Sequence, residues 1–179
     1  MRDETKQKIL KAALKEFAEK GYKGATTRVI ADKAGFTEMT LFRKFKTKKN
    51  LFSAVLNQNY EKMIGDFGSI IVDKEFENPK DFLENLIRNL VKLDENNFEF
   101  IKVTINESSR ISGNFLEEFV NNLSIYVEKN IQNDKIDYRI FVFDILSFIY
   151  FILLDYGHVF TDHEKAIEKF INNAVTCVK

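Results

Sequence analysis

The sequence of 179 residues has one proline and seven glycines, and strictly alternating β-branched runs are scarce. Because proline and glycine interrupt helices and alternation marks strands, these absences argue against a β protein and predict an all-α fold. Only one cysteine is present, Cys177, so no disulfide can form within a chain, which fits a reducing cytosol. Hydrophobic residues make up 45% of the sequence, which suffices for a buried core.

Residues arranged for catalysis are also missing. The two histidines, His158 and His163, lie five positions apart across an expected helix junction, and the sequence has no glycine-rich phosphate loop. Such residues do not supply a nucleophile with its base or a cluster of metal ligands. We therefore expect no enzyme activity, no cofactor and no metal site.

We expect neither a membrane span nor a secretion signal in this sequence. Its most hydrophobic run, residues 141–154, is shorter than the roughly 20 residues that a membrane helix needs, and it contains Asp144. We interpret this run as a buried helix. The N-terminus reads MRDETKQKIL and is too polar for a signal peptide, so we expect a cytoplasmic protein that does not enter a membrane.

The formal net charge is zero, but the charges are unevenly distributed. Residues 1–52 hold 14 lysines and arginines against 6 acidic residues, whereas residues 53–179 hold 13 against 21. A basic first third and an acidic remainder indicate an N-terminal module that meets a polyanion and a C-terminal module that does not. An ordinary solvated charged surface would give the same counts. The motif within the basic part decides between such a surface and a module that binds a polyanion.

The basic part contains two short helical patterns joined by a turn, in the stretch TTRVIADKAGFTEMTLFRKF at residues 26–45. Thr26 or Thr27 can cap the first helix and Thr37 the second, because a side-chain oxygen satisfies free N–H groups of the first turn. Gly35 suits the tight turn between them, where a positive φ is easiest for a residue without Cβ. The pattern predicts a helix-turn-helix motif.

This motif has an apolar and a polar side. The residues expected to point inward are Val29, Ile30, Ala34, Leu41 and Phe45. The second helix then presents a polar, partly basic side, which has the shape and chemistry to enter the major groove of DNA. A preceding helix over residues 3–20, ended by Gly21, would complete a three-helix headpiece.

Small and apolar residues recur along the first 52 residues at a characteristic spacing: Ile9, Leu10, Ala13, Phe17, Gly21, Tyr22, Thr26, Thr27, Ile30, Ala31, Ala34, Gly35, Thr40, Leu41, Phe45, Lys48 and Leu51. In these residues the chain resembles the TetR family of bacterial transcriptional regulators. The resemblance implies a helix-turn-helix DNA-binding domain at residues 1–47, followed by a helical ligand-binding and dimerisation domain at residues 48–179, with about nine helices in all. It also implies a double-stranded DNA operator as partner.

The resemblance further implies a role for particular residues. Thr27, Arg28 and Lys48 correspond to phosphate contacts of the family, and residues 37–40 correspond to the groove-facing start of its recognition helix. The candidate DNA-binding residues are therefore Thr27, Arg28, Thr37, Glu38, Met39, Thr40, Phe42, Arg43, Lys44 and Lys48.

Three residues depart from the family pattern. Phe42 lacks the hydroxyl of the usual tyrosine, so it keeps the packing and loses a hydrogen bond to phosphate. Met39 replaces a small residue and can touch a thymine methyl group or fill space. Phe36 is bulkier than the usual valine, and we interpret it as packing in the turn. DNA binding stays the prediction, while the operator sequence is left open.

Apolar periodicity predicts further helices over residues 48–70, 79–94, 98–108, 114–131 and 138–156, and a last helix that begins at a capping box of Thr161 and Glu164. Pro79 after Asn78 is a good helix start, and Asn114 with Glu117 resembles another capping box. The last two helices are too apolar for one small subunit to cover. We expect them to pair with their copies in a homodimer.

The second domain is expected to enclose a cavity for a small-molecule inducer. The candidate wall residues are Phe67, Ile101, Phe119, Phe148 and Phe151, and the candidate polar contacts are Asn106, Arg110, Asp144 and Tyr150. Each aromatic side chain also fits ordinary core packing. Asp144 and Asp155 lie in an apolar helix, where they would favour a cationic aromatic ligand.

Together these features predict a ligand-responsive transcriptional regulator, most simply a repressor. It would bind a palindromic operator as a dimer and be released by a small apolar or cationic inducer. The helix over residues 48–70 would transmit the change, provided that the ligand prefers one of two states. The alternative is a DNA-binding adaptor whose second domain recognises a protein partner rather than a small molecule.

Overall fold

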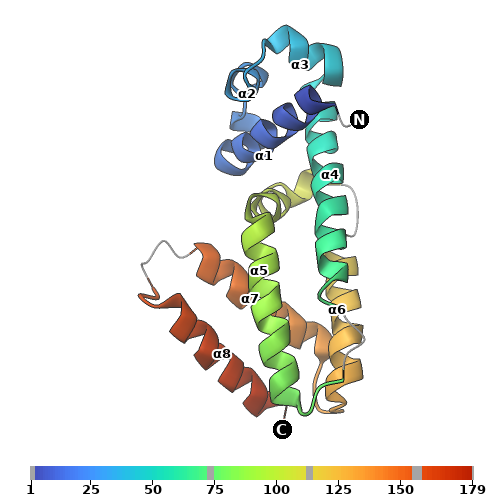
Figure 1. Ribbon diagram of the computed structural model, residues 1–179, viewed down its shortest axis with the longest axis vertical. Coiled ribbons are helices and arrows are strands. Elements are labelled where there is room, and N and C mark those ends of the chain that lie inside the picture. Colours follow the sequence, from blue (N-terminus) through green and yellow to red (C-terminus); the bar gives the residue numbers. More distant parts are fainter. Residues whose placement is uncertain (1–2, 72–74, 112–114, 155–158, 179) are drawn as a thin grey trace. The chain divides into compact units, whose positions relative to one another are not determined.

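The computed structural model describes residues 3–71, 75–111, 115–154 and 159–178. Within these ranges the chain forms eight α-helices and one short 3-10 helix, and no strand, which confirms the all-α prediction (Figure 1). Asn114, Asp155 and His158, which the sequence singled out, lie outside the described ranges. No helix in these ranges is both long enough and apolar enough to cross a membrane.

The chain divides into two compact units, which are described separately. Unit 1 comprises Met1–Gly65 and Asn97–Ser112, and unit 2 comprises Asp66–Asn96 and Gly113–Lys179. The helices α4 (Lys48–Gly68) and α5 (Pro79–Asn106) each contribute to both units. This division follows packing, so the functional boundary expected between residues 47 and 48 stays a prediction.

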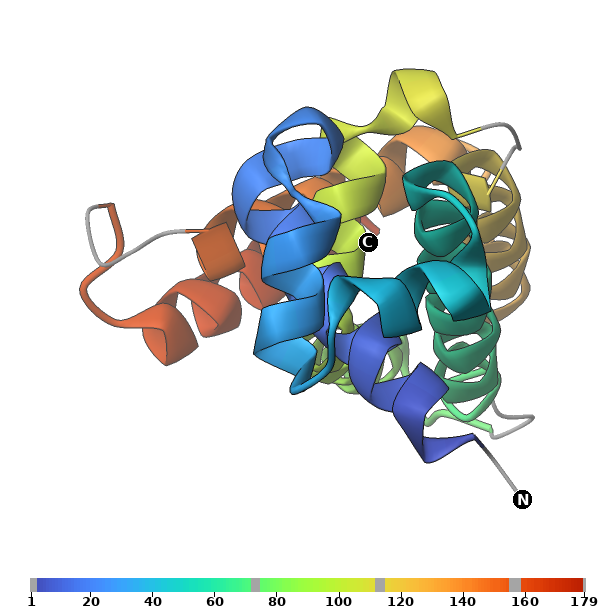
Figure 2. The same cartoon turned by 90° about the horizontal axis from the view of Figure 1, so that it is seen from above.

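Unit 1 starts with three helices, α1 (Glu4–Gly24), α2 (Thr27–Ala34) and α3 (Glu38–Phe45). It continues with most of α4 and also contains the last part of α5, which is followed by the 3-10 helix η1 (Ser108–Arg110). Figure 2 looks down on α2 and α3, and α2 packs against both α1 and α3.

Side chains cap the first three helices. Asp3, Thr26 and Thr37 each accept a hydrogen bond from the backbone N–H three residues later, at 3.2 to 3.3 Å. Thr26, rather than Thr27, is therefore the cap of α2. Gly35 ends α2 with a φ of 78°, a left-handed conformation that costs least for a residue without Cβ. The helix-turn-helix motif thus forms where its local signals predicted it.

A hydrophobic core holds unit 1 together. Phe17, Ile30 and Leu41 are at most 1% exposed, and Phe45 is 6% exposed, as predicted. The core also takes in Val103 from α5, which is fully buried. Residues close to the C-terminal end of α5 are therefore an integral part of the packing of unit 1.

Two expectations about the helices need correction. Val29 is 38% exposed, so the prediction that it points inward is wrong: the short α2 turns Ile30 and Ala31 to the core instead. The helices expected over residues 79–94 and 98–108 are one element, α5, with a break at Asn97, where φ is −125° and ψ is 16°. The described residues therefore form eight α-helices rather than the nine expected.

Unit 2 contains the first part of α5 together with α6 (Phe115–Ile131), α7 (Tyr138–Leu154) and α8 (His163–Cys177). The helices α6 and α7 pack against each other. Aromatic rings fill much of the interior: the ring centroids of Phe82 and Tyr126 lie 5.5 Å apart. Most buried residues of this unit are aliphatic or aromatic, which is typical of a helical core.

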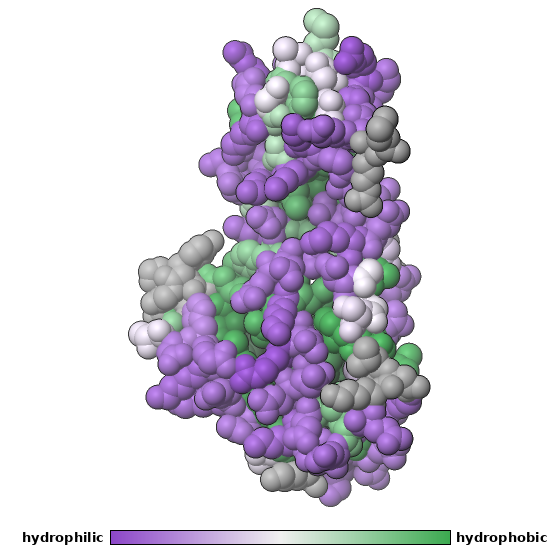
Figure 3. All heavy atoms as spheres, viewed as in Figure 1, coloured by the Kyte–Doolittle hydropathy of each residue, from purple (hydrophilic) through white to green (hydrophobic). Residues whose placement is uncertain are grey.

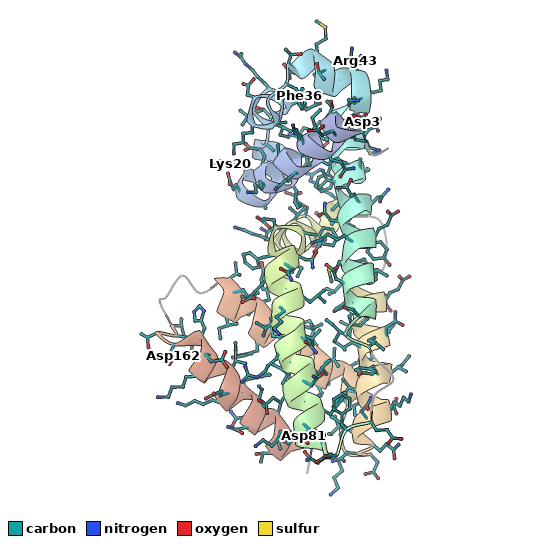
Figure 4. The ribbon with its side chains drawn as sticks, viewed as in Figure 1. Asp3, Lys20, Phe36, Arg43, Asp81 and Asp162 are labelled. Atoms are coloured by element: carbon teal, nitrogen blue, oxygen red, sulfur yellow. The ribbon has the colours of Figure 1, made fainter. Side chains whose placement is uncertain are left out.

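The starts of two helices in unit 2 show how local sequence sets them. Asn78 caps α5 by accepting the N–H of Asp81 at 3.0 Å, and Pro79 takes the first helical position, as predicted. The cap of α8 is Asp162, which accepts a backbone N–H at 3.0 Å. The predicted capping box with Thr161 is therefore wrong by one residue, because an aspartate side chain caps at least as well as threonine. Figure 4 labels Asp81 and Asp162 at these two helix starts.

Candidate nucleic-acid interface

The helix α3 carries most of the candidate DNA-contacting side chains, and its packing fixes which of them face outward. Because Leu41 and Phe45 are buried, the other side of the helix is left to solvent. Met39 is 81% exposed and Phe42 is 40% exposed. In Figure 4, Arg43 lies on α3, well away from Lys20 of α1. Unit 1 is mainly hydrophilic in Figure 3, with a small pale green area at α3.

Four exposed candidates are available to a partner molecule. The side chains of Arg28, Met39, Phe42 and Arg43 make no hydrogen bond or ion pair within the described residues. Arginine is the side chain that most often reads guanine, through O6 and N7, and apolar side chains contact the methyl group of thymine. These four residues offer both kinds of contact, from α2 and α3.

The threonines and the glutamate of the motif are held in pairs. The hydroxyl of Thr27 donates a hydrogen bond to the Glu38 carboxylate at 2.6 Å, which joins the first residues of α2 and α3. The hydroxyls of Thr37 and Thr40 lie 3.1 Å apart. These bonds fix the side chains before any partner arrives, and they leave acceptor oxygens free for the N–H donors of base edges. A phosphate oxygen only accepts, so Thr27 would have to turn its hydroxyl proton away from Glu38 to contact phosphate.

Two candidate lysines have partners inside unit 1. Lys44 forms an ion pair with Asp3, and the hydrogen bond from Lys44 is the main reason why the pKa of Asp3 is lowered. Lys48 donates a hydrogen bond to the carbonyl oxygen of Ala25. Burial, followed by the positive charge of Arg110, lowers the pKa of Lys48. Contact of these lysines with phosphate stays a prediction, since each ammonium would have to bind phosphate in addition to its present partner or in place of it.

The ligand-site candidates are divided between the two units. Ile101, Asn106 and Arg110 belong to unit 1, and Arg110 forms an ion pair with Glu107 at 2.9 Å. Asn106 is exposed and Ile101 is half-buried. The remaining six candidates belong to unit 2, and the structure brings only some of them together.

Within unit 2, the buried rings of Phe67 and Phe119 lie 4.5 Å apart between centroids. Phe148 instead stacks on Phe170 of α8, with centroids 4.0 Å apart and nearly parallel rings. Phe151 is 67% exposed, and Asp144 is exposed as well. An open hollow of about 430 Å³ lies next to the Phe148 and Phe170 pair and is also lined by Phe160, Lys165 and Lys169.

Asp94 of α5 is a polar residue that sequence reasoning did not single out. It is 5% exposed, and its side chain makes no hydrogen bond or ion pair in the described parts of the chain. Burial raises its pKa to about 7. Since no fully enclosed polar side-chain atom among the described residues lacks a partner, the carboxyl group keeps some contact with solvent-accessible space. Its neighbours in sequence are leucine and glutamate, and nothing in that pattern marks it as buried.

Comparison with known proteins places the motif. The family profile described as "Bacterial regulatory proteins, tetR family" matches residues 9–55. An uncharacterised HTH-type transcriptional regulator of Bacillus subtilis (strain 168), YvkB, is 32% identical over 122 residues, which are 68% of this chain and 59% of the relative. The HTH-type transcriptional repressor AcnR of Corynebacterium diphtheriae is 38% identical over 58 residues, 32% of this chain and 30% of the relative. The chain thus spans about three fifths or less of these curated relatives.

Solved structures share the fold over nearly the whole chain. AibR, in a crystal structure with isovaleryl coenzyme A and operator DNA, has a TM-score of 0.75 and 17% identity, covering 93% of this chain and 96% of that one. The ketosteroid transcriptional regulator KstR2 of Mycobacterium tuberculosis has a TM-score of 0.76 and 16% identity, covering 98% and 95%.

The chain is a helix-turn-helix protein of the transcriptional regulator class, as its N-terminal motif, its all-α fold and these matches indicate. The chain belongs to the TetR family.

Proposed function

We propose that this protein is a DNA-binding transcriptional regulator whose α3 enters the major groove of an operator. The observation that carries the proposal is a set of exposed side chains on α2 and α3 that have no polar partner in the part of the chain that the structure describes: Arg28, Met39, Phe42 and Arg43. They lie in the basic part of the chain, whose first 52 positions contain 14 lysines and arginines and 6 acidic residues. Basic side chains supply affinity through phosphates, and α3 supplies specificity.

The regulator is proposed to act as a homodimer through α7 and α8. The helix α7 exposes Ile140, Phe143 and Phe151, which are 61%, 56% and 67% exposed and follow the spacing of one helix face. Figure 3 shows hydrophobic surface over α7. A subunit that exposes such a face gains by pairing with a copy of itself, and a two-fold axis then calls for a palindromic operator.

A small molecule is proposed to control the affinity for DNA, with repression released by an apolar inducer. AibR was crystallised with isovaleryl coenzyme A and operator DNA, and KstR2 is named a ketosteroid regulator. The buried Phe67 and Phe119 rings of unit 2 suit an apolar ligand. A thermal-shift screen tests this: stabilisation by apolar acyl or steroid compounds supports a ligand sensor, whereas failure across a broad library favours a protein partner.

DNA binding itself is tested by selection of duplexes from a random-sequence library with the purified protein, followed by affinity measurement on the selected duplex. Arg43→Ala should weaken binding at least about fivefold, because one good arginine contact to a base contributes about 1–3 kcal/mol. Lys20→Ala removes a positive charge from α1, away from α3, and serves as the matched control (Figure 4). Failure to select any sequence would refute the proposal.

A further inference from the structure

Glu107, just after α5, reaches α1 across 85 positions of sequence. One carboxylate oxygen accepts the backbone N–H of Tyr22 at 2.8 Å, and the other lies 2.9 Å from Nε of Arg110 in an ion pair. The side chain is only 14% exposed. Although Glu107 occupies the cap position of η1, its side chain makes no capping hydrogen bond there. One carboxylate oxygen therefore binds the end of α1, and the other pairs with Arg110 of η1.

The contact falls where the helical backbone of α1 is broken. Gly21 has a φ of 67° and a ψ of 171°, a conformation that is nearly restricted to glycine. A Cβ atom at this position would lie 3.0 Å from the Glu107 carboxylate oxygen. The glycine thus permits both the break and the close approach, and the N–H of the next residue, Tyr22, bonds to a side chain from a distant part of the sequence.

Two cations gather around the ring of Tyr22. The ammonium nitrogen of Lys48 lies 4.8 Å from the ring centroid, and the guanidinium carbon of Arg110 lies 5.1 Å from it. Both cations are near enough to repel each other, and the Glu107 carboxylate is the acidic group that offsets this repulsion. The ring also packs edge-on against Phe52 at 5.0 Å.

These contacts continue to the recognition helix through short steps. Lys48 donates to the carbonyl of Ala25, the residue before the cap of α2. The first residue of α2, Thr27, donates to Glu38, the first residue of α3. Each step joins a residue to the start or end of the next element.

From this chain of contacts we propose that Glu107 is a positioning residue for DNA binding, which holds the connection between α1 and α2, and with it α3, in the arrangement that fits an operator. The proposal rests on the proposed DNA-binding function. It assigns the residues after Asn97 a direct part in that function, through Val103 in the core and Glu107 at its edge.

The test compares three variants on the duplex selected by the unaltered protein and on an unrelated duplex of equal length. Glu107→Ala removes the acceptor, whereas Glu107→Gln keeps an oxygen for the Tyr22 N–H and removes the charge. Glu99→Ala removes a carboxylate from the same stretch of α5 and is the matched control for charge. All binding is measured at a temperature at which urea titration shows each variant to be folded.

We expect Glu107→Ala to lose at least about fivefold in affinity for the selected duplex, the lower end of couplings between protein sites, with little change on the unrelated duplex. Glu107→Gln should stay within about threefold of the unaltered protein, because it retains a weaker, neutral hydrogen bond. Glu99→Ala should bind as the unaltered protein does. Selective loss in Glu107→Ala together with rescue by glutamine supports positioning.

The proposal is overturned if Glu107→Ala and the unaltered protein bind the selected duplex with equal affinity. It is also overturned if the alanine and glutamine variants gain affinity equally for both duplexes, because this would show an effect of charge alone. Should Glu107→Ala fail to fold, amide exchange at Tyr22 in the unaltered protein decides. Exchange at least about fivefold slower with the selected duplex bound supports the inference, and unchanged exchange overturns it. If the unaltered protein selects no sequence, the proposed function itself fails.

Discussion

Replacing Asp94 by asparagine should make the protein more stable, and increasingly so as the pH rises. The carboxyl group is 5% exposed and unpaired among the described residues, and burial raises its pKa from 3.8 to about 7. Between these two values the folded protein holds a proton that the unfolded chain has released. Stability is therefore lost progressively as the pH rises from about 4 to about 7, and the full penalty applies above pH 7.

The size of the effect follows from the pKa values. A shift of about 3 units, at 1.36 kcal/mol per unit, gives a total penalty of about 4 kcal/mol above pH 7. At pH 5 the unfolded carboxyl is already ionised, so part of the penalty is present. The stability gained by Asp94→Asn should thus grow by about 2–3 kcal/mol between pH 5 and pH 8.

Urea unfolding of both proteins at pH 5 and pH 8 measures this gain directly. Glu95→Gln, which alters the adjacent exposed carboxylate of α5, is the control, because that side chain is in water before and after unfolding. A stability difference between Asp94→Asn and the unaltered protein that is the same at both pH values would refute the reasoning.

The other predictions concern unit 1 and are checked by urea unfolding. Gly21→Ala should cost about 1–3 kcal/mol, because its φ of 67° and ψ of 171° suit glycine almost alone. Gly35→Ala should cost about 1–2 kcal/mol, because its φ of 78° is left-handed and a Cβ atom there meets nothing within 4 Å; a larger loss at position 35 than at 21 would count against the role of the α1 break. Thr26→Ala should cost about 1 kcal/mol through loss of the α2 cap, and an unchanged stability would mean that water replaces the cap. Leu41→Ala should cost about 2–5 kcal/mol, because the side chain is fully buried, and a loss under 1 kcal/mol would place Leu41 outside the core.

Local signals predicted the helix-turn-helix motif well. Gly35 ends α2 and Thr37 caps α3, because turn and cap preferences depend on residues only a few positions apart. The same reasoning failed at Val29, since an eight-residue helix can present either of two adjacent apolar residues to the core. The cap of α8 is Asp162 rather than the predicted Thr161, because two adjacent residues were both suitable as caps.

Long-range contacts were beyond sequence reasoning. Nothing near Glu107 indicates that its carboxylate meets the N–H of Tyr22, 85 residues earlier. The engagement of Lys48 with the carbonyl of Ala25 likewise depends on how α1 and α4 pack. For the predicted ligand-site residues, hydrophobicity indicated which positions are apolar but not which rings pack together. In the structure Phe67 packs against Phe119, whereas Phe148 stacks on Phe170.

The central claim is that the basic N-terminal parts of two protomers bind the phosphates of DNA while α3 reads the bases. The salt dependence of binding to the selected duplex tests this claim. The logarithm of the association constant should fall by about 0.9 per neutralised phosphate for each tenfold rise in salt, with two protomers on each duplex. An affinity that is independent of salt would contradict the account.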